Sequence, residues 1–117
     1  MAPGIRSCNV WVTLTDCGGD STAPGLEFLP RRFDQLVETG SHGAIFEWSV
    51  GDGLADEFAR DTPVIRPAFA AGDALLFDDL FLHRTALDPG MDTPRYALEH
   101  WFFAPSHYPS EQLPILF

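Results

Sequence analysis

Residues 8 to 15 alternate between two kinds of side chain with a period of two, which predicts a β-strand with two unlike faces. One face is aliphatic and carries Cys8, Val10, Val12 and Leu14, and the other is polar with one indole and carries Asn9, Trp11, Thr13 and Thr15. We expect the aliphatic face to pack on other protein, whereas the Trp–Thr face could line a pocket. Trp11 is equally well explained as a packing residue whose indole N–H is bonded, so both roles stay open.

Further short apolar runs lie between turns rich in Gly, Pro and Asp, and each is typical of a strand. The turn at Gly72-Asp73 leads into a run that we expect to end at His83. The last run is apolar on both faces, as in a sheet that is covered on both sides. The predicted strands after the first are 24–30, 62–70, 74–83 and 95–104, of which 62–70 holds two prolines and belongs at an edge or beside a bulge.

Two segments have helical character. Residues 31–38 place Phe33, Leu36 and Val37 on one side and stop at Gly40, and residues 54–60 form a second candidate. Residues 44–50 fit a strand or a helix. Together these signals predict one mainly β domain over residues 1–117, with one or two short helices.

Composition narrows the class of protein. The 117 residues are 45% hydrophobic and carry 17 acidic against 7 basic side chains, a net charge of −10. Such a chain is globular, and its charge argues against nucleic acid and against anionic membranes as partners. We find no apolar run of membrane-spanning length and no signal peptide. Cys8 and Cys17 are too few for a disulfide framework, so we expect a reduced, cytoplasmic protein.

Two side chains suggest a binding chemistry. His83 offers an imidazole, a common ligand of iron, copper or zinc, and Arg95 offers a planar fork that grips a carboxylate. If they lie on neighbouring strands, they suit a metal together with a carboxylate ligand. The plainer alternative is a structural hydrogen-bonded pair between His83 and Arg95 in a small β domain.

An ordered set of motifs supports the first interpretation. Gly72-Asp73-x-Leu75-Leu76-Phe77, then Leu82-His83-x-Thr85, then Asp88 and Arg95, resembles the C-terminal half of the phytanoyl-CoA dioxygenase family. The segment 24–30 after the Trp11 strand extends the resemblance. Two departures are Arg31-Arg32, which replace Gly-Ser-His, and Asp88, which stands where the family often has Asn.

The resemblance implies a fold and a site. Members of that family are Fe(II)- and 2-oxoglutarate-dependent oxygenases on a jelly-roll, or double-stranded β-helix, barrel. It implies that His83 is an iron ligand and that Arg95 binds the distal carboxylate of 2-oxoglutarate, with Thr85 and Trp11 beside it. We therefore expect an incomplete cupin-like jelly roll in which these four side chains share a cavity.

The first two iron ligands of the family, a His-x-Asp pair before the Trp11 strand, do not occur in the chain. A truncated hydroxylase and a short relative that has lost catalysis both explain this, and the retained His, Thr and Arg favour truncation. The alternative function is a non-catalytic cupin-like module that binds a small carboxylate or a protein partner. His42 with Glu47 resembles the cupin metal motif only weakly, and we expect a solvated loop histidine. His100 fits a core or interface position better than a ligand position.

Two expectations follow for the chain by itself. An incomplete barrel leaves free strand edges and apolar surface, so we expect a symmetric homodimer. A single imidazole does not hold Fe(II) against water, so we expect no turnover from this chain alone. The small-molecule substrate of the complete enzyme is not readable from these residues.

Overall fold

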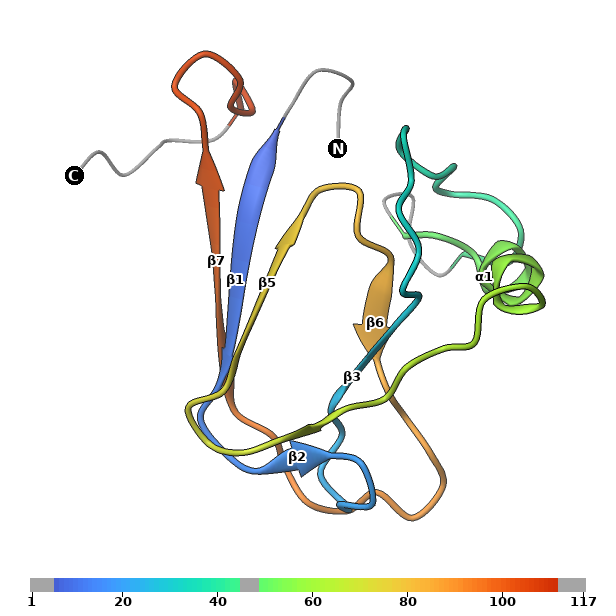
Figure 1. Ribbon diagram of the computed structural model, residues 1–117, viewed down its shortest axis with the longest axis vertical. Helices are drawn as coiled ribbons and strands as arrows, with labels where there is room; N and C mark the ends of the chain where they lie inside the picture. The colour runs from blue at the N-terminus through green and yellow to red at the C-terminus, as the bar shows by residue number, and fades with distance from the viewer. Residues whose placement is uncertain (1–5, 45–48, 112–117) are drawn as a thin grey trace.

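The computed structural model describes residues 6–44 and 49–111, which form three small antiparallel sheets and one short helix (Figure 1). This confirms the prediction of a mainly β chain. The elements in order are β1 (Ser7–Thr13), β2 (Cys17–Gly18), β3 (Leu26–Phe28), α1 (Asp52–Ala59), β4 (Ala68–Phe69), β5 (Ala74–Asp78), β6 (His83–Thr85) and β7 (Ala97–Phe103).

Strand β1 lies at the centre of the largest sheet, whose order is β5-β1-β7. Its odd-numbered side chains, including Trp11 and Thr13, are buried, whereas the even-numbered ones are half-buried or exposed. The second sheet pairs β3 with β6, and an isolated bridge adds Ile65 beside Phe28. The third sheet pairs β2 with β4.

The core is made by side chains from all three sheets. Trp11 packs edge-on against Phe69 with 5.1 Å between ring centroids. Leu26 from β3 and Phe77 from β5 belong to the same buried cluster, with Cys17 and Ala23. The polar and aromatic face of β1 is therefore the inner face, and the indole of Trp11 is a packing residue in this arrangement.

The aliphatic face of β1 lacks a cover among the described residues. Together with its neighbours on β5 and β7 it forms what we call the outer face, whose exposed large side chains are Leu14, Leu76, Tyr96, Leu98 and Phe102. The expectation that the last strand is covered on both sides is wrong for the described chain, because only Ala97 and Phe103 at its two ends are half-buried. His100 is likewise exposed and is not a core residue.

The expectation that one strand runs to His83 is also wrong. β5 stops at Asp78, whose backbone carbonyl accepts from the N–H of Phe81 and whose Oδ1 accepts from the N–H of Leu80 at 3.1 Å. This turn passes the chain from one sheet to another. His83 therefore begins β6 in the second sheet instead of ending β5.

The helix predicted over residues 31–38 does not form, and the chain there is irregular. Its apolar side chains are used in contacts between segments instead: Phe33 is buried and packs edge-on against Phe58 of α1, with centroids 5.0 Å apart. The second predicted helix is confirmed as α1. Of the predicted strand 62–70, only the bridge at Ile65 and β4 are paired, since the prolines at 63 and 67 lack an N–H.

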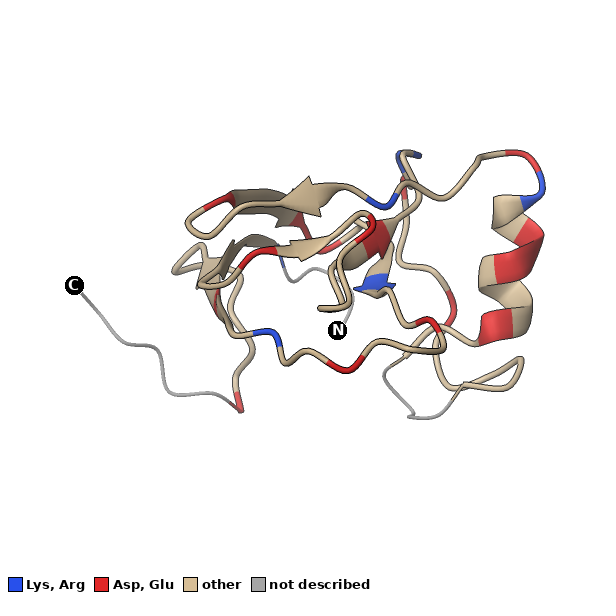
Figure 2. Cartoon of the chain, turned by 90° about the horizontal axis from the view of Figure 1, so that it is seen from below, with Lys and Arg blue, Asp and Glu red and all other residues tan. Residues whose placement is uncertain are grey.

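Charge is distributed unevenly over the elements. Acidic residues are concentrated in α1 and the loops, whereas most strand residues are uncharged (Figure 2).

Both cysteines are free, Cys8 exposed and Cys17 buried. Within the described ranges, no helix has the length and apolar character needed to cross a membrane. A cytoplasmic location stays a prediction.

A pair of leucines tests this division into inner and outer faces. Leu26 is 4% exposed and Leu76 is 65% exposed. Leu26→Ala leaves a cavity in the core and is expected to lower the free energy of unfolding by about 2–5 kcal/mol. Leu76→Ala is expected to change it by no more than about 0.5 kcal/mol. Urea unfolding of the two variants at low protein concentration measures both values, and equal losses would contradict the assignment of faces.

Candidate carboxylate site

Two strands and one loop converge on the guanidinium of Arg95, which lies just before β7. Its Nη1 donates to the backbone carbonyls of Pro24 at 3.2 Å and Gly25 at 3.1 Å, and its Nη2 donates to Thr85 Oγ1 of β6 at 3.4 Å. The guanidinium carbon lies 5.5 Å from the ring centroid of Trp11 on β1. The structure thus brings together the three side chains expected to bind 2-oxoglutarate: Arg95, Thr85 and Trp11.

Two glycines make this geometry possible. Gly18 has a positive φ of 73°, and a Cβ on Gly25 would lie 2.6 Å from the Cα of Gly18. Only residues without side chains allow the two backbones to approach so closely. This contact fixes the loop before β3, and it is this loop that presents the carbonyls of Pro24 and Gly25 to Arg95.

Arg95 differs from the other arginines of the chain. The other six are exposed, and four of them pair with carboxylates: Arg6, Arg32, Arg66 and Arg84. Arg95 is half-buried and contacts only neutral groups among the described residues. Its Nε–H and its second Nη2–H have no hydrogen-bond partner there. A half-buried cation with free donors and no carboxylate beside it is suited to bind a small carboxylate.

His83 lies on the same side of β6 as Thr85, two residues away, and is half-buried. Its Nδ1 is 2.9 Å from the carbonyl oxygen of Phe81, which can only accept, so Nδ1 carries the proton. The ring centroid is 4.3 Å from that of Phe77 and 5.7 Å from that of Phe81. The other nitrogen, Nε2, keeps its lone pair and is the atom that could bind a metal.

The alternative of a structural pair between His83 and Arg95 is not what the contacts show. His83 is bonded to the Phe81 carbonyl, whereas Arg95 is bonded to Thr85 and to the loop carbonyls. Both side chains lie between the first two sheets, but no hydrogen bond joins them.

A complete iron site is not present in residues 6–44 and 49–111. No group of three or more His, Cys, Asp or Glu side chains there could hold a metal ion. His42 is exposed, with Nδ1 2.7 Å from Ser41 Oγ, which fits the expected solvated loop histidine. Glu47 lies outside the described residues. His83 is therefore one candidate ligand, and the described residues do not fit a three-ligand site for Fe(II).

The inner face of β1 adds two polar side chains, Asn9, which the sequence placed on the polar face, and Ser7, which it did not single out. Ser7 and Asn9 are buried, and Ser7 Oγ and Asn9 Oδ1 have no hydrogen-bond partner among the described residues. Asn9 faces Phe77 across the sheet on one side and Trp101 on the other. The period of two could have found Ser7 as well, since it shares the face of Trp11.

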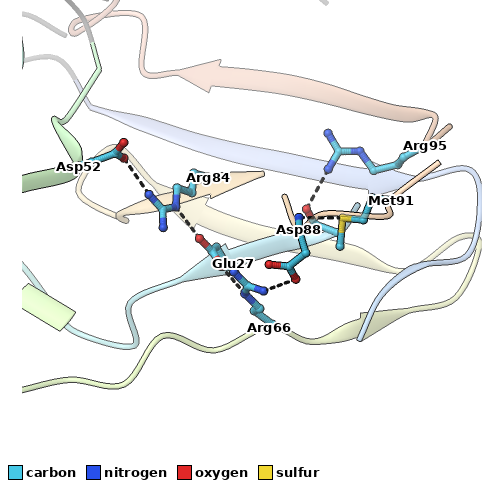
Figure 3. A network of polar contacts seen from close by, with 8 residues as sticks. Glu27, Asp52, Arg66, Arg84, Asp88, Met91 and Arg95 are labelled. Carbon is cyan, nitrogen blue, oxygen red and sulfur yellow. Dashed lines mark hydrogen bonds and ion pairs between the residues drawn. The ribbon is translucent and has the colours of Figure 1, made fainter. Parts of the chain in front are cut away.

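A second polar cluster lies on the opposite face of the β3–β6 sheet (Figure 3). Glu27 of β3 is buried and pairs with Arg66 through Oε2 and with Arg84 through Oε1, the latter at 2.5 Å. Arg66 also reaches Asp88 at 2.5 Å, and Arg84 reaches Asp52 of α1 at 2.9 Å. We call these five residues the Glu27 network. It ties the helix and the loop around Asp88 to the second sheet.

The two arginines control the charge of Glu27. Burial acts to raise the pKa of this carboxyl, but hydrogen bonds and charge from Arg84 and Arg66 outweigh it, so the pKa lies below its usual value of 4.5. The same contacts raise the pKa of Arg84 and of Arg66 above the usual value of a guanidinium. The carboxylate is therefore ionised at neutral pH and is a structural counter-charge, because both its oxygens are occupied.

Two hollows of the surface lie elsewhere. One of about 280 Å³ is lined by residues that include Arg6, Arg32, Asp78 and Asp79, and one of about 490 Å³ is lined by residues 33–38 and by Leu54 and Phe58 of α1. Neither is lined by His83 or Arg95. In the first, both arginines are paired with aspartates, Arg6 with Asp79 and Arg32 with Asp78.

No family model matches the chain, and neither a curated protein nor a solved structure is significantly similar to it.

The depressed pKa of Glu27 makes a testable contribution to stability. Glu27→Gln leaves two arginines without their shared carboxylate, and we expect it to lower the free energy of unfolding at pH 7 by about 1–3 kcal/mol. A carboxyl with a lowered native pKa stabilises the fold above its unfolded pKa and loses that effect as the pH falls through the native pKa. The difference between wild type and variant should therefore shrink below about pH 4.5.

Asp52→Asn is the matched control for this test. Asp52 also pairs with Arg84 but is exposed, so its loss should cost no more than about 1 kcal/mol. Denaturant unfolding of the three proteins from pH 3 to pH 8 measures the effect. A Glu27→Gln loss that stays constant across this range would show that the charge of Glu27 is not its cause.

Proposed function

We propose that this chain is the C-terminal part of a jelly-roll oxygenase of the phytanoyl-CoA dioxygenase type, and that its Arg95 site binds one carboxylate of 2-oxoglutarate. The observation that carries the proposal is the convergence of Arg95, Thr85 and Trp11 from three separate segments of the chain on one half-buried point. These are the residues that the resemblance assigns to the co-substrate. They are far apart in the sequence, so neither alternation nor local spacing brings them together.

The course of the chain supports the jelly-roll part of the proposal. Apart from β2 and β4, which pair in the third sheet, the strands alternate between the other two sheets: β1 lies in the first, β3 in the second, β5 in the first, β6 in the second and β7 in the first. All the pairings are antiparallel. Such alternation between facing sheets is typical of jelly rolls.

The site has separate roles for its side chains. Arg95 supplies the fixed positive charge and two free N–H donors. Thr85 and the loop carbonyls orient its guanidinium, and Trp11 covers one side of it and excludes water. When bound in a complete enzyme, iron supplies the activation of oxygen. From this chain His83 offers Nε2 to such a centre, and the remaining ligands are not among the described residues.

A carboxylate-binding module without catalysis is the second candidate. Specific support for it comes from Arg95, whose free donors need no metal in order to bind a carboxylate. This function requires the same side chains as the first, so the two differ only in whether an oxidation follows binding.

Binding of 2-oxoglutarate tests the assignment of Arg95. We expect the chain to bind 2-oxoglutarate weakly and Arg95→Gln to lose about 1.5–3 kcal/mol of that binding, the range for hydrogen bonds to a charged group. This corresponds to a roughly tenfold to hundredfold lower affinity. Titration followed by NMR chemical shifts of the indole and backbone amides provides the measurement.

Arg60→Gln is the matched control, because Arg60 is exposed and lies after α1, outside the site. It should bind 2-oxoglutarate as the wild type does. Since Arg95 also holds loop carbonyls, the thermal unfolding of each variant is compared first. Thr85→Val provides a milder second variant with an intermediate loss. Equal affinity of folded Arg95→Gln and wild type would overturn the proposal.

A turnover assay tests whether this chain alone carries out the oxidation. With Fe(II), ascorbate and 2-oxoglutarate, we expect no more succinate from the wild type than from His83→Ala, because one imidazole does not retain iron. Succinate above that control would show that additional ligands, with residues 45–48 as the first place to search, complete the site.

A further inference from the structure

We propose that two copies of this chain associate through the free edge of β7, with the two strands antiparallel and His100 on the two-fold axis. This inference does not depend on the carboxylate site. It concerns a strand that the proposed function does not use, and it specifies both the occupant of the edge and the register.

The backbone of β7 has a defined set of free groups. The N–H of Leu14 donates to the carbonyl of Tyr96 at 2.8 Å, in the same register as the whole β1–β7 ladder. Because bonding alternates along an antiparallel pair, the even-numbered residues of β7 bond to β1 and the odd-numbered ones point away. The outward groups belong to Ala97, Glu99, Trp101 and Phe103, and among the described residues they have no backbone partner.

β7 lacks the features that normally protect an edge strand. It is seven residues long, has no proline or lysine, and carries a single charge, that of Glu99. In and just before it, Tyr96, Leu98, Trp101 and Phe102 are between 49% and 61% exposed. Figure 1 shows β7 at the outer side of its sheet, beyond β1. By contrast, β6 has three residues and β5 carries Asp78 at its end.

The strand is complementary to itself in one register. Pairing all seven residues with a second copy places His100 opposite His100, which fixes every other pair. Leu98 then faces Phe102, Ala97 faces Phe103, and Glu99 faces Trp101 of the second copy. In this register the outward-pointing residues face one another, 97 with 103 and 99 with 101. Their backbone N–H and C=O groups can therefore form the bonded pairs of an antiparallel ladder.

This register also keeps the Glu99 carboxylates of the two acidic chains from facing each other. Glu99 lies opposite an indole instead of a second carboxylate, and within the chain Trp101 Nε1 already donates to Glu99 Oε1 at 3.0 Å. The same donor and acceptor can pair between copies. The product is a six-stranded sheet with the order β5-β1-β7-β7-β1-β5, in which the apolar outer faces of the two copies become continuous.

The mass of the full chain over a concentration series, by light scattering or sedimentation, tests the pairing. Glu99→Pro removes an outward N–H and none of the bonds to β1, so we expect the association constant to fall at least tenfold with the fold retained. Glu99→Thr removes the same charge but keeps the N–H, and it should associate at least as well as the wild type. Circular dichroism and thermal unfolding check the fold of both variants.

Engineered cysteines test the register and stay decisive if Glu99→Pro fails to fold. In a Cys8→Ser background, His100→Cys places two thiols opposite each other at a non-bonded pair, where Cα atoms are about 4.5 Å apart and a disulfide fits. Leu98→Cys is the matched control on the same face. Its two copies are offset by four residues, or about 13 Å, and should not cross-link under the same mild oxidation.

Each outcome of these experiments either supports or overturns the proposal. A dimer that Glu99→Pro weakens, together with cross-linking of His100→Cys alone, supports the proposal. A monomer at every concentration overturns it. A dimer unaffected by Glu99→Pro but lost in Leu76→Glu, which charges the outer face two strands away, also overturns it and shows that the outer faces pack on each other instead. Preferential cross-linking of Leu98→Cys overturns the register.

Discussion

The fold depends on β1 being bonded on both sides. Its odd-numbered residues bond to β5, as shown by Thr13 N–H to the carbonyl of Asp73, and its even-numbered residues bond to β7, as shown by Leu14 N–H to the carbonyl of Tyr96. With both edges occupied, the strand has no freedom to slip. A slip by one residue would turn Trp11 and Thr13 out of the core and bring the aliphatic face in. Every contact of Trp11, including that with Arg95, follows from this register.

Ion pairs connect segments of the chain that lie outside the buried core. α1 has no fully buried residue; the Asp52–Arg84 ion pair connects it to the second sheet, and its Phe58 packs on Phe33 in the irregular segment after β3. Arg84 is shared with Glu27, so the helix is linked to the second sheet through one buried carboxylate. Four of the seven arginines are used in such pairs, which leaves Arg95 as the half-buried guanidinium able to bind a carboxylate from outside.

Neither the outer face nor the edge of β7 has a partner among the described residues. The strands pair and enclose a core on one side, while leucines and aromatic side chains remain exposed on the other. A sheet with such a face and a free edge is well suited to associate with another chain, because association buries apolar area and completes backbone hydrogen bonds in the same step. The candidate carboxylate site lies before β7 and the free edge runs along it, so binding and association can be tested separately.

The sequence by itself determined what depends on neighbours along the chain. The period of two placed Trp11 and Thr13 on one face of a strand, the predicted strand 95–104 contains β7, and residues 54–60 marked most of α1. The motifs also selected Arg95, Thr85 and Trp11 as one group. The strands and the helix depend on local backbone geometry, which a short stretch of residues controls, whereas the grouping of Arg95, Thr85 and Trp11 came from the resemblance.

Only the tertiary structure decided how distant segments meet. The alternation of β1 does not tell which face is inside, because an aliphatic face can be left for a partner while Trp11, Leu26 and Phe69 close the core. The turn after Asp78 moved His83 to another sheet, and contact with Phe58 kept Phe33 out of a helix. Glu27 is buried because Arg66 and Arg84, 39 and 57 residues away, neutralise it. Such burial depends on contacts between segments, which no local pattern contains.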